Sequence, residues 1–81
     1  MEAGKLTEAI KRYPFTPVRL LVSDGSHYDI THPDQVFVTR RWCYVGVGGN
    51  GESFYEDNAV IDNLHITRIE PLRKARRKKS L

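Results

Sequence analysis

The 81-residue sequence predicts a mainly β protein, in which an N-terminal helix precedes five antiparallel strands that form a small barrel. Apolar residues recur with a helical period only near the N-terminus, and after Pro17 they alternate with a period of two. No second helical pattern follows that could connect parallel strands, so antiparallel neighbours with short connections are expected. Closing such a sheet into a barrel would remove its exposed edges.

The N-terminal segment has the pattern of an amphipathic helix. Leu6, Ala9, Ile10 and Tyr13 fall at positions i, i+3, i+4 and i+7, which share one helix face. Pro14 is expected to end the helix. Because a helix of about ten residues is marginal by itself, we expect it to pack against the strands.

The next segment predicts a β-hairpin. Residues 18–22 form its first strand and residues 27–30 its second, and Asp24-Gly25 lies between them. This pair indicates a tight turn because both residues can adopt positive φ angles. Residues 31–34, Thr-His-Pro-Asp, predict a further turn, in which proline presets its own φ angle.

Residues 35–47 form a β-rich run that is long for one regular strand. We expect one strand with a strong bend or bulge at Arg40-Arg41, since strands bend where a small barrel closes. Glycine-rich residues 46–51 predict a loop. Residues 53–55 and 59–61 then form two halves of a fourth strand, and residues 64–69 a fifth that Pro71 ends.

The net charge of +3 is unevenly distributed. Residues 1–72 hold seven basic and all ten acidic residues, a net charge of −3, and are expected to form one domain. Residues 73–81 are expected to form a disordered basic tail. The six cations of this tail are Arg73, Lys74, Arg76, Arg77, Lys78 and Lys79.

Several classes of protein are disfavoured. Cys43 is the only cysteine, so no intrachain disulfide and no four-cysteine zinc site is expected. No apolar run approaches about 18 residues, and charges interrupt the N-terminal segment, so neither a membrane span nor a signal peptide is expected. We expect a cytoplasmic protein that has no membrane partner.

Three segments resemble the bacterial Sm-like RNA chaperones (Hfq-like proteins). Residues 17–25 are similar to the first strand and hairpin of that family, residues 34–38 to the start of its third strand, and residues 66–71 to its closing strand. The resemblance implies a Sm-like or SH3-like barrel that forms rings by strand pairing. A Lys-His pair of the family, which binds uridine-rich RNA, corresponds here to Asn63 and Leu64, so the uridine pocket is not expected.

A second resemblance is to small uncharacterised bacterial proteins. They carry a Pro-Phe-x-Pro-x-Arg-Leu segment, here residues 14–20, followed by an Asp-Gly hairpin and a His-Pro pair, here Asp24-Gly25 and His32-Pro33. This resemblance implies no particular function.

The sequence contains little that predicts catalysis. Residues 46–51 match G-x-G-x-x-G, but no helical pattern follows, so a hairpin loop is the better interpretation. His27, His32 and His65 fit no compact metal-ligand spacing. Cys43 beside Arg41 could be a reactive thiol, although a small buried apolar residue is more common in a β-rich run. We expect neither an enzyme nor a cofactor.

Two segments indicate that the protein could bind nucleic acid. Arg40, Arg41, Trp42 and Tyr44 interleave cations with aromatic rings that could stack on bases, although a buried core strand is the more common explanation. The tail cations could contact phosphates with release of counterions, or the tail could be solubilising or contact a neighbouring acidic subunit.

The sequence therefore predicts a non-catalytic nucleic-acid-binding module, with RNA as the expected ligand. The alternative is a protein-interaction or assembly module. In that case an exposed strand edge would pair with a partner or with a second copy, giving a homo-oligomer.

Overall fold

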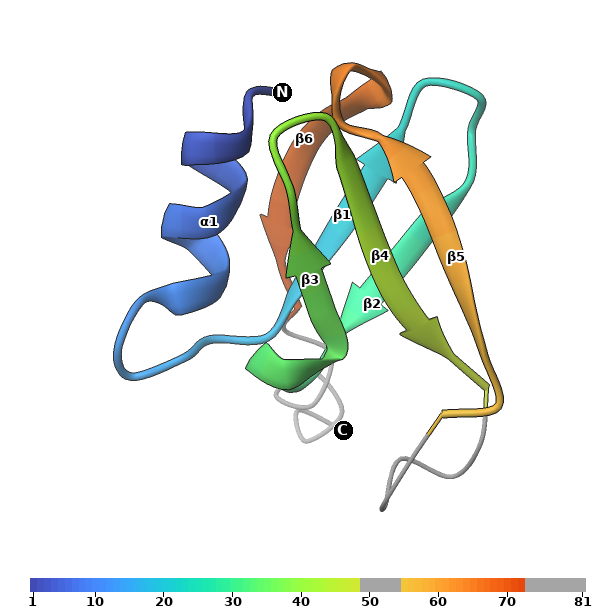
Figure 1. Cartoon of the computed structure of the whole chain (residues 1–81). Helices are drawn as coiled ribbons and strands as arrows, with labels where there is room; N and C mark the ends of the chain where they lie inside the picture. The colour runs from blue at the N-terminus through green and yellow to red at the C-terminus, as the bar shows by residue number, and fades with distance from the viewer. Residues whose placement is uncertain (49–54, 73–81) are drawn as a thin grey trace, which may run out of the picture.

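A computed structural model of the protein describes residues 1–48 and 55–72 (Figure 1). These residues form one helix, six strands and two short 3₁₀ turns. In chain order they are α1 (Ala3–Lys11), β1 (Val18–Val22), β2 (His27–Ile30), η1 (Pro33–Gln35), β3 (Val36–Val38), β4 (Trp42–Val47), β5 (Asp57–Asp62), η2 (Asn63–His65) and β6 (Ile66–Pro71). The expected tail, residues 73–81, and the middle of the glycine-rich loop lie outside the described residues.

The strands form two antiparallel sheets, ordered β2-β1-β6 and β3-β4-β5. The predicted mainly β fold with one N-terminal helix is therefore confirmed. In the part of the chain that is described, strands number six instead of five, and no strand pairing joins the two sheets into a closed barrel.

The expected bent strand at residues 35–47 is instead a hairpin made of β3 and β4. Phe37 lies opposite Tyr44, and Val38 lies opposite Cys43. Thr39 closes the turn: its backbone N–H donates to Trp42 O (2.8 Å), and its Oγ1 accepts from Trp42 N–H (3.0 Å). The prediction of a bend was wrong because this short-range hydrogen bonding reverses the chain direction.

The β1–β2 hairpin is confirmed, but its loop is longer than a two-residue turn. Val22 N–H donates to Ser26 O (3.0 Å), so Ser23, Asp24 and Gly25 form the loop. Gly25 has a φ angle of 94°, and no described residue other than glycine has a positive φ. Gly25 therefore provides the single left-handed position that a three-residue hairpin loop requires.

The ends of the helix and of the last strand differ from the expectation. α1 ends at Lys11, and Tyr13 lies beyond it with 96% of its surface exposed. A residue before proline disfavours helical backbone, which explains the early end. Leu64 and His65 belong to η2, because Asp62 Oδ1 accepts the Leu64 N–H (3.0 Å), and β6 continues through Pro71.

One apolar core connects the helix with both sheets. Its buried members are Leu6, Ile10, Val18, Leu20, Ile30, Val36, Cys43, Val45, Ile61 and Ile66. Figure 1 shows α1 beside β3 and β6, on the side of the molecule opposite β2 and β5. The described part of the chain contains no helix that is long and apolar enough to cross a membrane.

Candidate functional site

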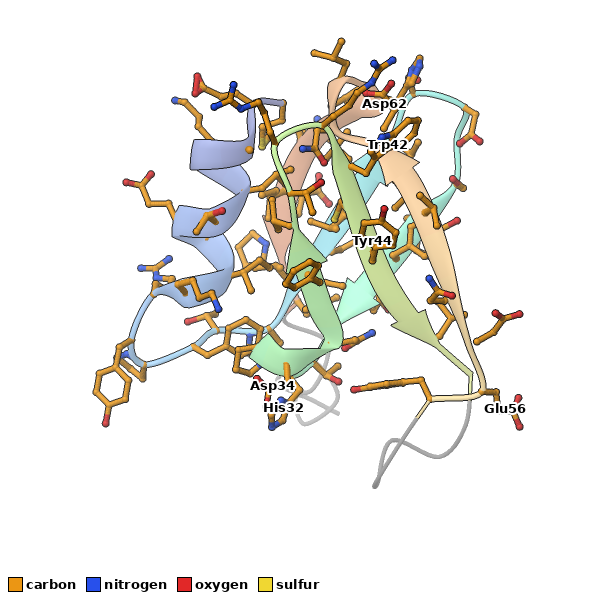
Figure 2. All side chains as sticks on the ribbon, in the orientation of Figure 1. His32, Asp34, Trp42, Tyr44, Glu56 and Asp62 are labelled. Atoms are coloured by element: carbon orange, nitrogen blue, oxygen red, sulfur yellow. The ribbon has the colours of Figure 1, made fainter. Side chains whose placement is uncertain are left out.

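Trp42 and Tyr44 lie on the outer face of the β3-β4-β5 sheet (Figure 2). Along β4, Cys43 and Val45 are buried, whereas Trp42 is 38% exposed and Tyr44 is half-buried. Side chains alternate between the faces of a strand, so the core takes the first pair and the surface takes the second. The interpretation that both aromatic residues belong to the core is wrong.

The outer face contains two further exposed apolar residues that the sequence did not mark as functional. Phe37 and Val60 both pair with Tyr44, from β3 and β5, and are 68% and 54% exposed. The Phe37 and Tyr44 ring centroids are 6.3 Å apart at an interplanar angle of 49°. We call Phe37, Trp42, Tyr44 and Val60 the aromatic face. The alternation of Phe37 with Val36 and Val38 was the signal that could have found it.

Arg40 and Arg41 are exposed at the tip of the β3–β4 hairpin, at one end of the aromatic face. The Arg41 guanidinium carbon lies 5.2 Å from the centroid of the Trp42 ring. Arg41 Nε is also 3.8 Å from Asp62 Oδ2, although the Arg41 side chain remains 70% exposed. Exposed contacts of these kinds contribute about 1 kcal/mol or less each, so the guanidinium remains available to a ligand.

Asn63 supports this hairpin tip from beneath. Its side chain is 2% exposed, and its Nδ2 donates to Thr39 O (2.9 Å) and Arg40 O (3.1 Å). Its backbone N–H donates to Arg41 O (2.9 Å). Asn63 is thus an internal brace for the turn.

The remaining predicted site residues cannot be placed. Arg73, Lys74, Arg76, Arg77, Lys78 and Lys79 all lie outside the described residues. Leu72, the last described residue, donates its N–H to Pro17 O (3.0 Å). The described structure therefore brings together only the Arg40, Arg41, Trp42 and Tyr44 part of the predicted interface.

The Cys43 thiol and the Ser23–His65 pair, which could suggest catalysis, have structural explanations. Cys43 is fully buried, and burial raises its pKa to about 11, so it is a protonated core thiol at neutral pH. Ser23 Oγ and His65 Nδ1 lie 3.0 Å apart on the surface, beside a backbone hydrogen bond between the same residues. In residues 1–48 and 55–72, no three His, Cys, Asp or Glu side chains are placed to hold a metal ion.

The G-x-G-x-x-G segment begins in a strand. Gly46 and Val47 belong to β4, and the next described element is the strand β5 instead of a helix. A Cβ atom at Gly46 would lie 2.6 Å from Tyr55 Cδ2, so glycine is needed here for the close approach of the Tyr55 ring. Around this segment, the described residues contain no helix N-terminus of the kind that binds pyrophosphate in dinucleotide-binding proteins.

Comparison of the chain with models of protein families, with curated proteins and with solved structures found no match.

Proposed function

We propose that this protein is a non-catalytic module that binds single-stranded nucleic acid, RNA in the first place, on a Sm-like or SH3-like small-barrel scaffold in the cytoplasm. The observation that carries the proposal is the aromatic face with Arg40 and Arg41 at its end. Bases stack on exposed aromatic rings with about 1–3 kcal/mol each, whatever their sequence. Trp42 and Tyr44 are two positions apart on β4, a separation of roughly 7 Å, which leaves room for a different base on each ring.

The tail cations would supply phosphate contacts. Residues 1–72 carry a net charge of −3, so the fold by itself would repel a polyanion at long range. The six cations at residues 73–79 reverse that sign, and release of counterions from the nucleic acid would favour binding at low salt.

The test uses a mixed-sequence single-stranded RNA and two readouts. Trp42 is the only tryptophan, and stacking of a base on its ring should quench its fluorescence. Anisotropy of labelled RNA then measures the affinities of variants. Tyr44→Leu should weaken binding about fivefold or more, whereas Tyr13→Leu, at an exposed tyrosine beyond α1, should change nothing. Equal affinities of the two variants for RNA would show that the aromatic face is not part of the RNA-binding surface.

A matched pair of double variants tests the cations. Arg40→Gln with Arg41→Gln should lower the slope of log affinity against log salt by about 2. Lys5→Gln with Arg12→Gln removes the same charge from the helical side of the molecule and should leave the slope closer to that of the unmodified protein. No binding of the full chain at low salt would overturn the proposed function.

The exposed aliphatic side chains favour one alternative function. Val60 on the aromatic face and Leu64 in η2 are 54% and 79% exposed, and neither can stack or pair with a nucleotide charge. An apolar surface of this kind is typical of protein association, in which this face would bind a protein or a second copy. Sedimentation of the full chain distinguishes the two: self-association that Val60→Lys abolishes, without RNA binding, would favour assembly.

A further inference from the structure

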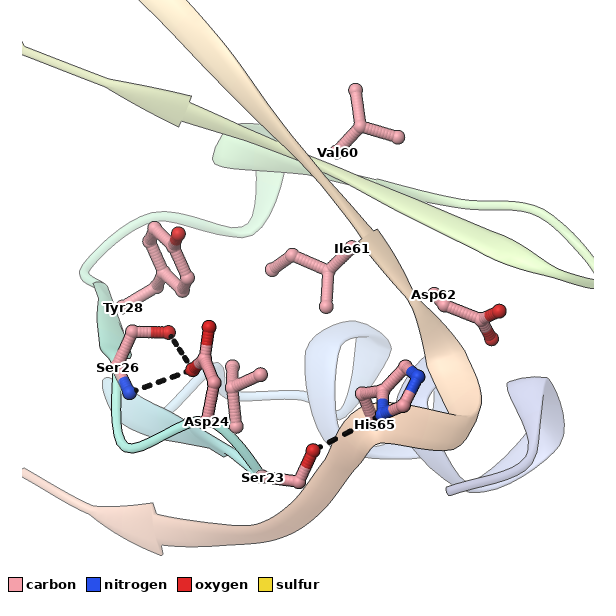
Figure 3. Close-up of a pocket in the computed structure, with 9 residues that line it drawn as sticks. Ser23, Asp24, Ser26, Tyr28, Val60, Ile61, Asp62 and His65 are labelled. Atoms are coloured by element: carbon pink, nitrogen blue, oxygen red, sulfur yellow. Dashed lines mark hydrogen bonds between the residues drawn. The ribbon is translucent and has the colours of Figure 1, made fainter.

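The side of the molecule opposite α1 carries a trough between the two sheets. One hollow of about 320 Å³ lies between the β1–β2 loop and β5, and Asp24, Tyr28 and Asp62 line it (Figure 3). A second hollow of about 300 Å³ lies between β2 and the end of β4, and Tyr28 and Asp29 line it. Because Tyr28 borders both hollows, they adjoin, and we call them together the β2–β5 trough.

The trough suits an amphipathic cation. Its lining includes three carboxylates, Asp24, Asp29 and Asp62, and no lysine or arginine among the described residues. Asp29 is paired with Arg19 at 2.7 Å and Asp62 lies 3.8 Å from Arg41, whereas Asp24 accepts hydrogen bonds from Ser26 N–H and Oγ. These hydrogen bonds from Ser26, the side-chain one first, lower the pKa of Asp24, which keeps it ionised.

Apolar side chains lie between these carboxylates, in a lining that also contains Ser23, Ser26 and His65. Val22, Ile61 and Tyr28 line the first hollow together with Asp24 and Asp62. An arginine or lysine side chain combines an apolar stem with a charged end, so it can cover such a wall while its cation reaches a carboxylate at the rim. The carboxylates beside these apolar side chains favour the stem and charged end of a basic side chain over an anion.

The first hollow lies between two strand edges, whereas the second lies between the edge strand β2 and the central strand β4. β2 and β5 each pair with a neighbour on one side only in the described sheets. At one end the Gln35 side chain crosses the gap, where its Nε2 donates to Asp29 O and to Gly46 O, both at 3.0 Å. Edges of this kind accept an extended segment through backbone hydrogen bonds.

The end of the described chain lies near one entrance of the trough. Val18 pairs with Ile30 of β2 on one side and with Pro71 of β6 on the other. Strands are spaced by about 4.8 Å, so Leu72 follows at about 10 Å from the end of β2. Nine extended residues span about 30 Å, enough to cross this distance and run antiparallel to the four residues of β2.

We propose that the β2–β5 trough binds the basic C-terminal segment of the same chain, residues 73–81, with cations of its second half at Asp24 and Asp62. Six positive charges meet a body of net charge −3, which makes the pairing complementary. The inference does not depend on RNA binding, but it predicts that an RNA backbone would compete with the trough for these cations.

The experiment places a nitroxide on the full chain through Ser80→Cys, without nucleic acid. Cys43 is fully buried, so the label goes to position 80. In ¹⁵N-labelled protein the amide signals of Asp24, Tyr28 and Asp62 should broaden at low salt and recover in about 1 M salt, where the Debye length is about 3 Å. Equal signal intensities with oxidised and reduced label at these three positions would overturn the proposal.

Two further samples sharpen the test. A mixture of spin-labelled ¹⁴N protein with unlabelled ¹⁵N protein should show no broadening, and equal broadening there would assign the contact to a second copy and overturn binding within one chain. Asp24→Asn with Asp62→Asn keeps the oxygen acceptors for Ser26 and Leu64 and should reduce the broadening severalfold. Glu2→Gln with Glu8→Gln removes the same charge on the α1 side and should leave the broadening unchanged. Unaltered amide spectra in the rest of the protein show that each variant folds.

Discussion

Asn63 is the polar side chain that the fold buries most deeply in residues 1–48 and 55–72. Its two donor contacts reach Thr39 and Arg40, more than twenty positions earlier in the chain. Its Oδ1 has no hydrogen-bond partner among the described residues, so within them the carboxamide acts through its N–H groups. A donor at this position therefore connects η2 to the β3–β4 turn, and through that turn it holds the base of the proposed interface.

Replacing Asn63 with alanine should destabilise the protein by about 2 kcal/mol, because two carbonyl groups lose their donor in a buried place. Asn58→Ala, at an exposed position of β5, should change the free energy of unfolding by less than about 0.5 kcal/mol. Urea unfolding followed by Trp42 fluorescence measures both. Equal midpoints for the two variants would show that Asn63 is not a structural brace.

The buried Cys43 thiol predicts that the free energy of unfolding depends on pH in the alkaline range. Burial raises the pKa of its thiol from 9.0 to about 11, so the folded state holds this proton more tightly than the unfolded state does. The stability linked to this group is therefore complete below pH 9 and is lost as the pH rises towards 11. The free energy of unfolding should fall more steeply over this interval than in Cys43→Val, and parallel pH profiles would contradict the prediction.

Among the elements, the β3–β4 hairpin depends on one hydroxyl group. Thr39 Oγ1 accepts from Trp42 N–H at 3.0 Å and donates to Trp42 O at 2.8 Å, next to the backbone bond between the same residues. Thr39→Val keeps the shape of the side chain and removes these two bonds. We expect a loss of about 1 kcal/mol in the free energy of unfolding.

The control for this variant is Thr7→Val on the exposed surface of α1, which tests the same substitution away from any turn. Differential scanning calorimetry should show a lower melting temperature for Thr39→Val than for this control. A Thr39→Val protein as stable as the control would mean that the backbone contacts alone close the turn.

The molecule as a whole has a single core, and α1 is part of it. Leu6 and Ile10 are 0% and 1% exposed and belong to the same buried cluster as Val36 and Cys43 of the second sheet and Leu20 of the first. A nine-residue helix is marginal in isolation, so its stability must come from this packing. Helix and sheets are therefore expected to unfold together.

Leu6→Ala should lower the free energy of unfolding by about 2–4 kcal/mol. The unfolding midpoints of the helix and of the sheets should fall together. Far-ultraviolet circular dichroism follows the helix, and Trp42 fluorescence follows the second sheet. Coincident transitions in both proteins would support a single cooperative unit. Loss of the helical signal at lower urea than the Trp42 signal would show that α1 unfolds by itself.

The sequence alone determined a mainly β fold with one N-terminal helix and the Asp24-Gly25 hairpin, but it merged β3 and β4 into one bent strand. The helix and the hairpin follow from local periodicity and turn chemistry, which act between near neighbours. Alternation along residues 42–47 also showed that Trp42 and Tyr44 share a face, but it could not show which face is buried. The pattern alone does not distinguish the two faces.

Tertiary packing decided which face of β4 is buried. Cys43 and Val45 are buried with Val36 and Ile61 in the core that α1 covers, and this leaves Trp42 and Tyr44 facing solvent. The contact of Asn63 with the turn at Thr39 and Arg40 likewise joins residues that are distant in sequence. Only the three-dimensional arrangement brings such groups together, because the free energy of burial depends on which surfaces meet and not on the spacing of residues along the chain.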